Sequence, residues 1–257
     1  MNPQEKLKLV ERATWESAQN REGQIVISMP TWVQITSPAA PTPFMNGVLR
    51  CEVADEEAEA LIDRTLAHFR SLNLPFRWKI VPSTKPADLA RRLEARGMYR
   101  KERLFGLIAA AGQVQIESPA DVRVEPVTLE NLEDWLLVQA HAWNVPPPGI
   151  AFQRRAMATA LASRESPYEN YLAYFDDEAV GSAALRLSTE YVYLMGGAVK
   201  ESHRRRGIYR ALTAHRLQRL AGLGLPAVVH CLEHTSAPIC LKLGFEKICQ
   251  IDSFEPG

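Results

Sequence analysis

Apolar residues in the C-terminal half of the chain repeat with two different periods. Residues 191–199 (YVYLMGGAV) form a compact apolar run bounded by polar residues, a pattern that predicts a strand. Residues 208–221 instead place Leu212, Leu217 and Leu220 on one side at helical spacing, which predicts an amphipathic helix. The polar stretch between these two elements therefore leads from the end of a strand to the N-terminus of a helix.

The N-terminal half also alternates between strand and helix patterns. Its clearest element is an amphipathic helix at 55–72, in which Ala58, Ile62 and Phe69 share one side and acidic residues cover the other. Three prolines between positions 38 and 43 mark a loop, because proline does not fit inside a regular element. The other elements expected in this half are a helix at 4–19 and strands at 24–29 and 47–53.

One order of elements occurs twice along the chain. The order is a strand, a short helix and a glycine at which the chain leaves the helix, and it occurs at 76–97 and again at 227–244. The strand and helix cover 76–81 and 87–95 in the first copy, and 227–232 and 234–243 in the second. This repetition of elements indicates two related units. Chance similarity between α/β segments is the alternative.

We therefore expect two units, at 1–115 and 116–257, joined through residues 109–119. The remaining pattern of the second unit predicts a strand, two helices and a hairpin. Their expected positions are 122–126, 128–141, 152–164, and 171–175 with 179–187, with prolines at 146–148 breaking the chain between the helices.

The stretch at 203–210 (HRRRGIYR) is typical of an anion-binding loop. The first N–H groups of a helix lack intrahelical partners and carry partial positive charge, so they bind phosphate well. Gly207 allows close approach to the backbone, and four arginines add donors that match phosphate oxygens. A solvated basic surface is the alternative. The first unit has the acidic run 51–61 (CEVADEEAEAL) before its helix instead, so we expect no such site there.

The loop resembles the pyrophosphate loop of the GCN5-related N-acetyltransferases, which has the form Arg/Gln-x-x-Gly-x-Gly/Ala at the start of a helix. Arg204, Gly207 and Tyr209 occupy its three defined positions, and Tyr209 replaces the usual small residue. The resemblance covers about 118–257. It implies an α/β fold, with a central, mostly antiparallel sheet flanked by helices, and the first unit is then a degenerate copy of the same domain.

The end of the repeated motif carries a second resemblance to this family. Gly244-Phe245 matches a signature in which a tyrosine commonly stands where this chain has Cys240. The family uses acetyl-coenzyme A, and the substrate amine attacks the thioester directly. The residues that the resemblance and the loop chemistry assign to the cofactor are Ala198, Val199, Arg204, Arg205, Arg206, Gly207, Ile208, Tyr209, Arg210 and Ser236. Gly196-Gly197 would permit a bulge beside the pantetheine arm.

Such a reaction needs a group that accepts the proton of the amine and can use one that protonates the leaving thiolate. Glu190 is the first candidate for the acceptor, and Tyr191, Tyr193 and Glu201 are the alternatives. Cys240 is the candidate donor, because a thiol has an ordinary pKa of about 8.5, below that of tyrosine. Packing of a buried cysteine is equally compatible with the sequence. We therefore expect an N-acetyltransferase for a small-molecule, amino-acid or peptide amine, and a non-catalytic acyl-coenzyme A-binding module is the alternative.

Composition limits the partners. The 30 basic and 30 acidic residues give a formal net charge of zero, so no general attraction to nucleic acid or anionic membranes is expected. The four cysteines form no CxxC pair, and His230, Cys231 and His234 lack a suitably spaced fourth ligand, so we expect no metal. Without a signal-like start or an apolar run of membrane length, a cytoplasmic location is expected. A monomer is favoured, with a homodimer as the alternative.

Overall fold

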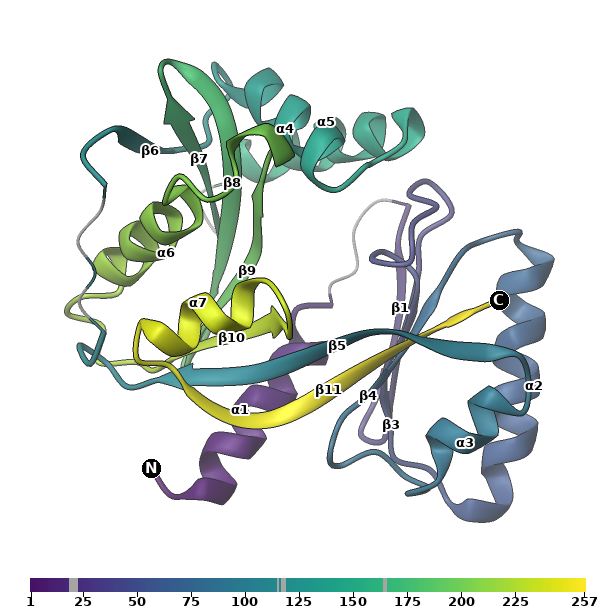
Figure 1. Cartoon of the computed structure of the whole chain (residues 1–257). Coiled ribbons are helices and arrows are strands. Elements are labelled where there is room, and N and C mark those ends of the chain that lie inside the picture. The colour runs from purple at the N-terminus through teal and green to yellow at the C-terminus, as the bar shows by residue number, and fades with distance from the viewer. Residues whose placement is uncertain (19–22, 115, 117–118, 164–165) are drawn as a thin grey trace. The chain divides into compact units, whose positions relative to one another are not determined.

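The chain folds into two compact units. The computed structural model describes residues 1–18, 23–114, 116, 119–163 and 166–257 (Figure 1). The first unit comprises 1–106 together with 248–257, and the second comprises 107–247. The sequence had placed 248–257 in the second unit. The expected boundary residue 115, and the helix ends expected at Gln19 and Arg164, lie outside the described residues.

The first unit combines an antiparallel hairpin with one parallel strand pair. Strands β1 (Ile25–Met29), β2 (Trp32–Thr36) and β3 (Gly47–Cys51) pair antiparallel, and β3 pairs with β4 (Arg77–Ile80) in parallel. Strand β11 (Glu246–Pro256) then pairs antiparallel with β4. The helices are α1 (Pro3–Glu16), α2 (Asp55–Ser71) and α3 (Leu89–Glu94), and β5 (Met98–Ala109) leads into the second unit.

Aromatic packing holds this unit together. The rings of Phe69, on α2, and Phe76 stack with centroids 4.3 Å apart, and Trp32 meets Trp78 edge to face at 5.5 Å. Strand β2 was not expected from the sequence. All five of its residues are buried, so it lacks the polar–apolar alternation by which a half-exposed strand is found.

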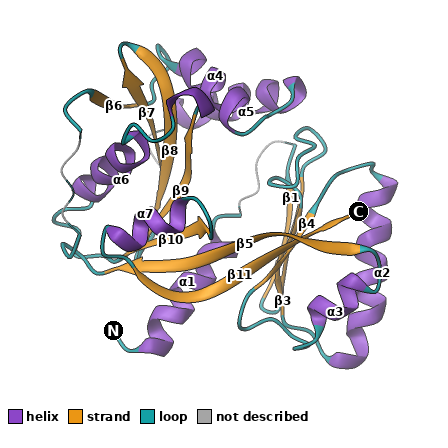
Figure 2. Cartoon of the chain, in the orientation of Figure 1, coloured by secondary structure: helices purple, strands orange, loops and turns teal. Residues whose placement is uncertain are grey.

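The second unit contains a mostly antiparallel sheet with helices on both faces. Its strands are β6 (Val122–Pro126), β7 (Tyr168–Phe175), β8 (Glu178–Leu187), β9 (Val192–Val199) and β10 (Ala227–Leu232), in the order β10-β9-β8-β7-β6. Helices α4 (Leu132–Ala142) and α5 (Pro147–Ala162) lie on one side, and α6 (Ile208–Arg219) lies on the other (Figure 2). Helix α7 (Ser236–Lys242) follows β10. The expected fold class is confirmed.

Two local features of the second unit follow from backbone chemistry. The β7–β8 hairpin turns at Asp176 and Asp177, which both have positive φ, as a two-residue turn requires. Helix α5 begins at Pro147, five residues before the position expected from the sequence. Proline fits the first helical turn because the N–H that it lacks has no partner there.

No helix in the described part of the chain is both long and apolar enough to cross a membrane.

Candidate functional site

Strands β9 and β10 run parallel at first and then separate. They pair at three positions, of which Leu194↔Val229 is the last. On its other side β9 carries a bulge, because Ser182 and Ala184 of β8 pair with Ala198 and Met195, so that one residue of β8 faces two of β9. The bulge contains Gly196, whose φ is +62°. The bulge lies at the paired glycines, where the sequence would permit one, and a bulge bends the strand that carries it.

This separation leaves one edge of β9 available to a ligand. Along the described residues, the β9–β10 register does not extend to the segment from Met195 to Val199. Ala198 and Val199 remain paired with β8. An extended chain such as a pantetheine arm can hydrogen-bond to a strand edge of this kind, as a peptide does when it adds to a sheet.

The basic loop connects this edge to the start of α6. A short 3₁₀ turn at Glu201–His203 precedes Arg204, Arg205 has φ +65°, and Gly207 has φ +79° as the residue before the helix. No side chain caps the N-terminus of α6. A side chain at position 207 would meet Pro119, since its Cβ would lie 2.8 Å from the proline Cγ. The glycine is therefore required both by its φ and by its neighbour.

The arginines of the loop are exposed, and two have aromatic or acidic neighbours. Arg206 lies over the ring of Phe175, with its guanidinium carbon 5.1 Å from the centroid, and Arg204 approaches Glu201 at 3.8 Å. Arg205 is exposed beside them. Ile208 is buried and would collide with any side chain at Gly181 of β8. This contact fixes the helix start against the sheet, while the charged side chains extend into solvent.

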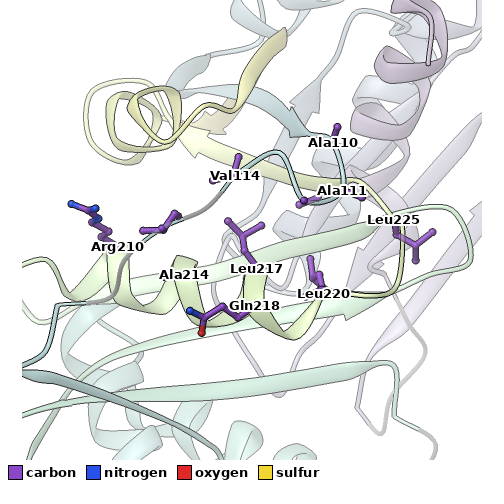
Figure 3. A pocket seen from close by; sticks show the side chains of 13 residues that line it. Ala110, Ala111, Val114, Arg210, Ala214, Leu217, Gln218, Leu220 and Leu225 are labelled. Atoms are coloured by element: carbon purple, nitrogen blue, oxygen red, sulfur yellow. The ribbon is translucent and has the colours of Figure 1, made fainter.

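Arg210 lies beyond the loop and lines a different surface. A pocket of about 680 Å³ lies along α6, between Arg210 at one end and apolar side chains at the other (Figure 3). Among the residues that the structure describes, the pocket is lined by residues between 110 and 116, by α6 and by residues that follow α6. Arg210 was expected to join the phosphate-binding arginines, and this assignment stays a prediction.

Tyr209 reaches from α6 to the two cysteines of the second unit. A Cβ at Gly197 would lie 2.8 Å from the tyrosine Cε2, so the glycine makes room for the ring against β9. The tyrosine hydroxyl lies 3.7 Å from Cys240 Sγ on α7. Cys231 of β10 donates its S–H to Cys240, with the sulfur atoms 3.5 Å apart. Burial raises the pKa of Tyr209 well above its ordinary value.

The same contacts change the acidity of the two thiols. Hydrogen bonding to Cys231 is the largest influence that lowers the pKa of Cys240, and Tyr209 adds to it. The bond to Cys240, together with burial, raises the pKa of Cys231. Ser236, which was expected to contact the cofactor, lies at the first position of α7 and interacts with Cys231. The expected donor Cys240 therefore belongs to a cluster of three protic side chains.

Arg216 supports the bulge from inside, a role that the sequence analysis missed. Its guanidinium donates to the carbonyl of Ala184 at 2.9 Å and to that of Met195 at 3.3 Å, and it is almost completely buried. Burial lowers its pKa. The signal was present in the sequence, because Arg216 follows Ile208 and Leu212 at intervals of four on the buried side of α6.

Glu190 and Tyr191 lie at the other end of β9. Glu190 is exposed, and Tyr191 is fully buried with its N–H donated to Ser188 Oγ. Since a strand advances about 3.3 Å per residue, Glu190 lies roughly 20 Å along the chain from Gly196. The fold thus brings Cys240 to the loop and the strand edge, but it does not bring Glu190 or Tyr191 there.

A second pair, on β9 and β10, lies closer to the point of separation. The hydroxyl of Tyr193 and Nδ1 of His230 are 3.0 Å apart. His230 is the first residue of β10 after the last pairing with β9. Neighbouring strand residues point to opposite faces, so the side chains of His230 and Cys231 lie on opposite faces of β10, next to the point where the pairing with β9 ends. Among the described residues, no group of three His, Cys, Asp or Glu side chains could hold a metal ion.

Comparisons with known proteins cover the part of the chain that contains these residues. The family model described as Acetyltransferase (GNAT) family matches residues 129–245, a span that includes β9, the basic loop and α7. The search of curated proteins found no match.

Solved structures resemble nearly the whole chain. A conserved protein of unknown function from Staphylococcus epidermidis ATCC 12228 has 13% identity and a TM-score of 0.70, covering 90% of this chain and 93% of that one. A GCN5-related N-acetyltransferase from Kribbella flavida has 17% identity and a TM-score of 0.65, with 91% and 90% covered. A tandem GNAT protein from the clavulanic acid biosynthesis pathway has 13% identity and a TM-score of 0.59, with 100% and 96% covered. At these identities, the similarity establishes the fold.

Proposed function

Since the model of the acetyltransferase (GNAT) family matches residues 129–245, we propose that this protein transfers an acetyl group from acetyl-coenzyme A to a primary amine. The family transfers acyl groups from acyl-coenzyme A in general. The acceptor that we propose is a small molecule, an amino acid or a peptide. The amine attacks the thioester carbonyl directly while both substrates are bound, and coenzyme A leaves as the thiolate.

One observation carries this proposal: the basic loop connects the edge of β9 that β10 does not cover to the N-terminus of α6, which no side chain caps. The pantetheine arm would lie along Gly196–Val199, and the pyrophosphate would meet the first N–H groups of α6. Arg204, Arg205 and Arg206 would neutralise its charge, and their exposed side chains are free to fold over the phosphates. Burial of Arg216 beneath the bulge supports the shape of this edge without using a loop arginine.

The sulfur cluster is the proposed source of the proton for the leaving thiolate. Cys240 has the lower pKa of the two cysteines because it accepts the bond from Cys231. A lower pKa makes it the better donor to a thiolate, provided that it is protonated at the working pH. Cys240 thus takes the place of the tyrosine that the family commonly carries, and the phenol of Tyr209 lies beside it.

The pair formed by Tyr193 and His230 is the proposed proton acceptor, in preference to Glu190. An imidazole titrates near neutral pH and can take a proton from an ammonium group. The hydrogen bond to Tyr193 orients the ring. With His230 and Cys231 on opposite faces of β10, the acceptor amine and the departing thiol would lie on different sides of the gap.

Release of free thiol from acetyl-coenzyme A, measured against a panel of primary amines, tests the proposal. Turnover with at least one amine, lost in His230→Gln with affinity for acetyl-coenzyme A retained, is the expected result. Binding by calorimetry without turnover on any amine would instead support an acyl-coenzyme A-binding module. Tyr209, which stands on α6 where the family usually has a small residue, is the observation that favours this second function.

A further inference from the structure

The second unit holds two thiols in direct contact. Cys231 lies on β10 and Cys240 on α7, with 3.5 Å between their sulfur atoms, and both side chains are buried. The other two cysteines, Cys51 and Cys249, belong to the first unit and are buried free thiols. The chain therefore provides a thiol pair and two single thiols of similar burial for comparison.

Disulfide formation requires the two sulfur atoms to approach further. A disulfide requires sulfur atoms about 2 Å apart, so the two must move closer by roughly 1.5 Å. Helix α7 has only seven residues, and no side chain caps its N-terminus. A short, weakly capped helix after a turn can shift by this amount more easily than a strand in the middle of a sheet.

The surroundings of the pair give the two thiols different roles: one attacks the oxidant, and the other then closes the disulfide. Cys240 accepts hydrogen bonding from Cys231 and lies near the hydroxyl of Tyr209. These contacts stabilise a thiolate on Cys240, which is the form that attacks an oxidant. The raised pKa of Cys231 keeps its thiol protonated to a higher pH than that of Cys240. Its contact with Cys240 places it to react second.

We propose that Cys231 and Cys240 form a reversible disulfide when the protein reacts with a hydroperoxide. The thiolate of Cys240 attacks the terminal peroxide oxygen, the O–O bond breaks, and an alcohol leaves after taking up a proton. Cys240 is then a sulfenic acid. The sulfur of Cys231 attacks it, the S–S bond forms, and water leaves. The two thiols lose two electrons in total, and one hydroperoxide is reduced to an alcohol and water.

The consequence for catalysis rests on the proposed function. A disulfide removes the thiol hydrogen of Cys240 and draws α7 toward β10, beside the gap that the pantetheine arm would enter. Acetyl transfer should therefore fall at least tenfold on oxidation and return after treatment with dithiothreitol.

Peptide mapping of the full-length protein tests the chemistry without any turnover. The reduced protein is treated with tert-butyl hydroperoxide, denatured, alkylated and digested. No Lys or Arg separates the two cysteines, so trypsin leaves both in the peptide 220–242, whereas cleavage after Glu233 divides it. We expect the two halves to remain joined until dithiothreitol is added, and Cys51 and Cys249 to be alkylated.

Three variants complete the design. Cys231→Ser and Cys231→Ala should abolish the joined peptides, and Cys249→Ser should leave them unchanged. Oxidation of wild-type protein that leaves Cys231 and Cys240 as open to alkylation as Cys51 would overturn the proposal. A mapped disulfide with no loss of acetyl transfer would overturn only its catalytic consequence. Absence of turnover in the reduced protein would count against the proposed function and would leave the mapped disulfide standing.

Discussion

The two units contain the same series of elements around a parallel strand pair. In the first, β3, α2, β4 and α3 follow one another and lead into β5. In the second, β9, α6, β10 and α7 lead into β11. The parallel pairing is short in both, with two positions between β3 and β4 and three between β9 and β10. The repeat expected from the sequence is therefore present in the order and pairing of the elements.

The helix that follows the first strand differs between the two units. Helix α2 starts with Asp55, Glu56 and Glu57, and Arg92 of α3 donates to the Asp55 carboxylate at 2.5 Å. Helix α6 starts after three arginines and Gly207, with no acidic residue in its first turn. In the first unit, carboxylates thus stand where an anion would bind. Helix geometry alone therefore does not make a phosphate site, because the charge around the start of the helix decides whether an anion binds.

Removing the loop arginines should have the largest effect. The double variant Arg204→Ala/Arg206→Ala should bind acetyl-coenzyme A at least 100-fold more weakly, because each charge-assisted hydrogen bond contributes about 1.5–3 kcal/mol. Calorimetry measures the affinity and, on the wild-type protein, the stoichiometry.

The matched control removes two exposed arginines of α2, in Arg64→Ala/Arg70→Ala, and should leave affinity unchanged. One acetyl-coenzyme A per chain is expected. Binding of two acetyl-coenzyme A molecules per chain, or an equal loss of affinity in both double variants, would contradict the assignment of the site to the second unit alone.

Loss of the buried arginine should have the next largest effect. Arg216→Met leaves the carbonyls of Ala184 and Met195 without their donor, which should lower the free energy of unfolding by about 3 kcal/mol. Arg219→Met, one turn further along α6, removes an exposed pair with Glu169 and should cost less than about 1 kcal/mol. Urea denaturation measures both, and similar losses in the two variants would show that Arg216 does not hold the bulge.

The residue that follows the parallel pairing differs between the units, and in the first unit it should make stability depend on pH. This position is His230 in the second unit and Lys79 in the first, where burial lowers the pKa of the lysine well below 10.5. The unfolded chain then binds more protons, so stability should rise with pH between the lowered pKa and 10.5. Lys79→Met should remove this rise and the exposed variant Lys242→Met should keep it, as urea denaturation across this pH range would measure. An identical pH dependence in Lys79→Met and wild type would contradict the assignment.

The smallest effects should have opposite signs in the two helices. Glu57 and Arg210 both occupy the third position of their helices, α2 and α6. Near a helix N-terminus, a carboxylate stabilises and a cation destabilises by about 0.3–1 kcal/mol. Glu57→Gln should therefore lower thermal stability slightly, and Arg210→Gln should raise it. Both shifts should shrink in high salt, and shifts of the same sign would argue against a dipole effect.

Most elements could be predicted from periodicity, and the exceptions have physical reasons. The strand at Ala227–Leu232 and the helix start at Asp55 coincide with the expectation. Strand β2 was missed because both its faces are covered, and α5 begins early because proline is tolerated in a first helical turn. The return of residues 248–257 to the first unit was also missed, since strand partners are chosen over long distances in the chain.

The fold class, the place of the basic loop and its absence from the first unit follow from the amino-acid sequence alone. These are local properties, because charge, glycine and periodicity act between near neighbours. The side chains that meet could be identified only from the folded chain: Tyr209 extends to Cys240, and Cys231 contacts Cys240 as well. His230, and not Glu190, lies where β9 and β10 separate. These residues are between 9 and 37 positions apart, and packing of helices against the sheet, not spacing in the chain, brings them together.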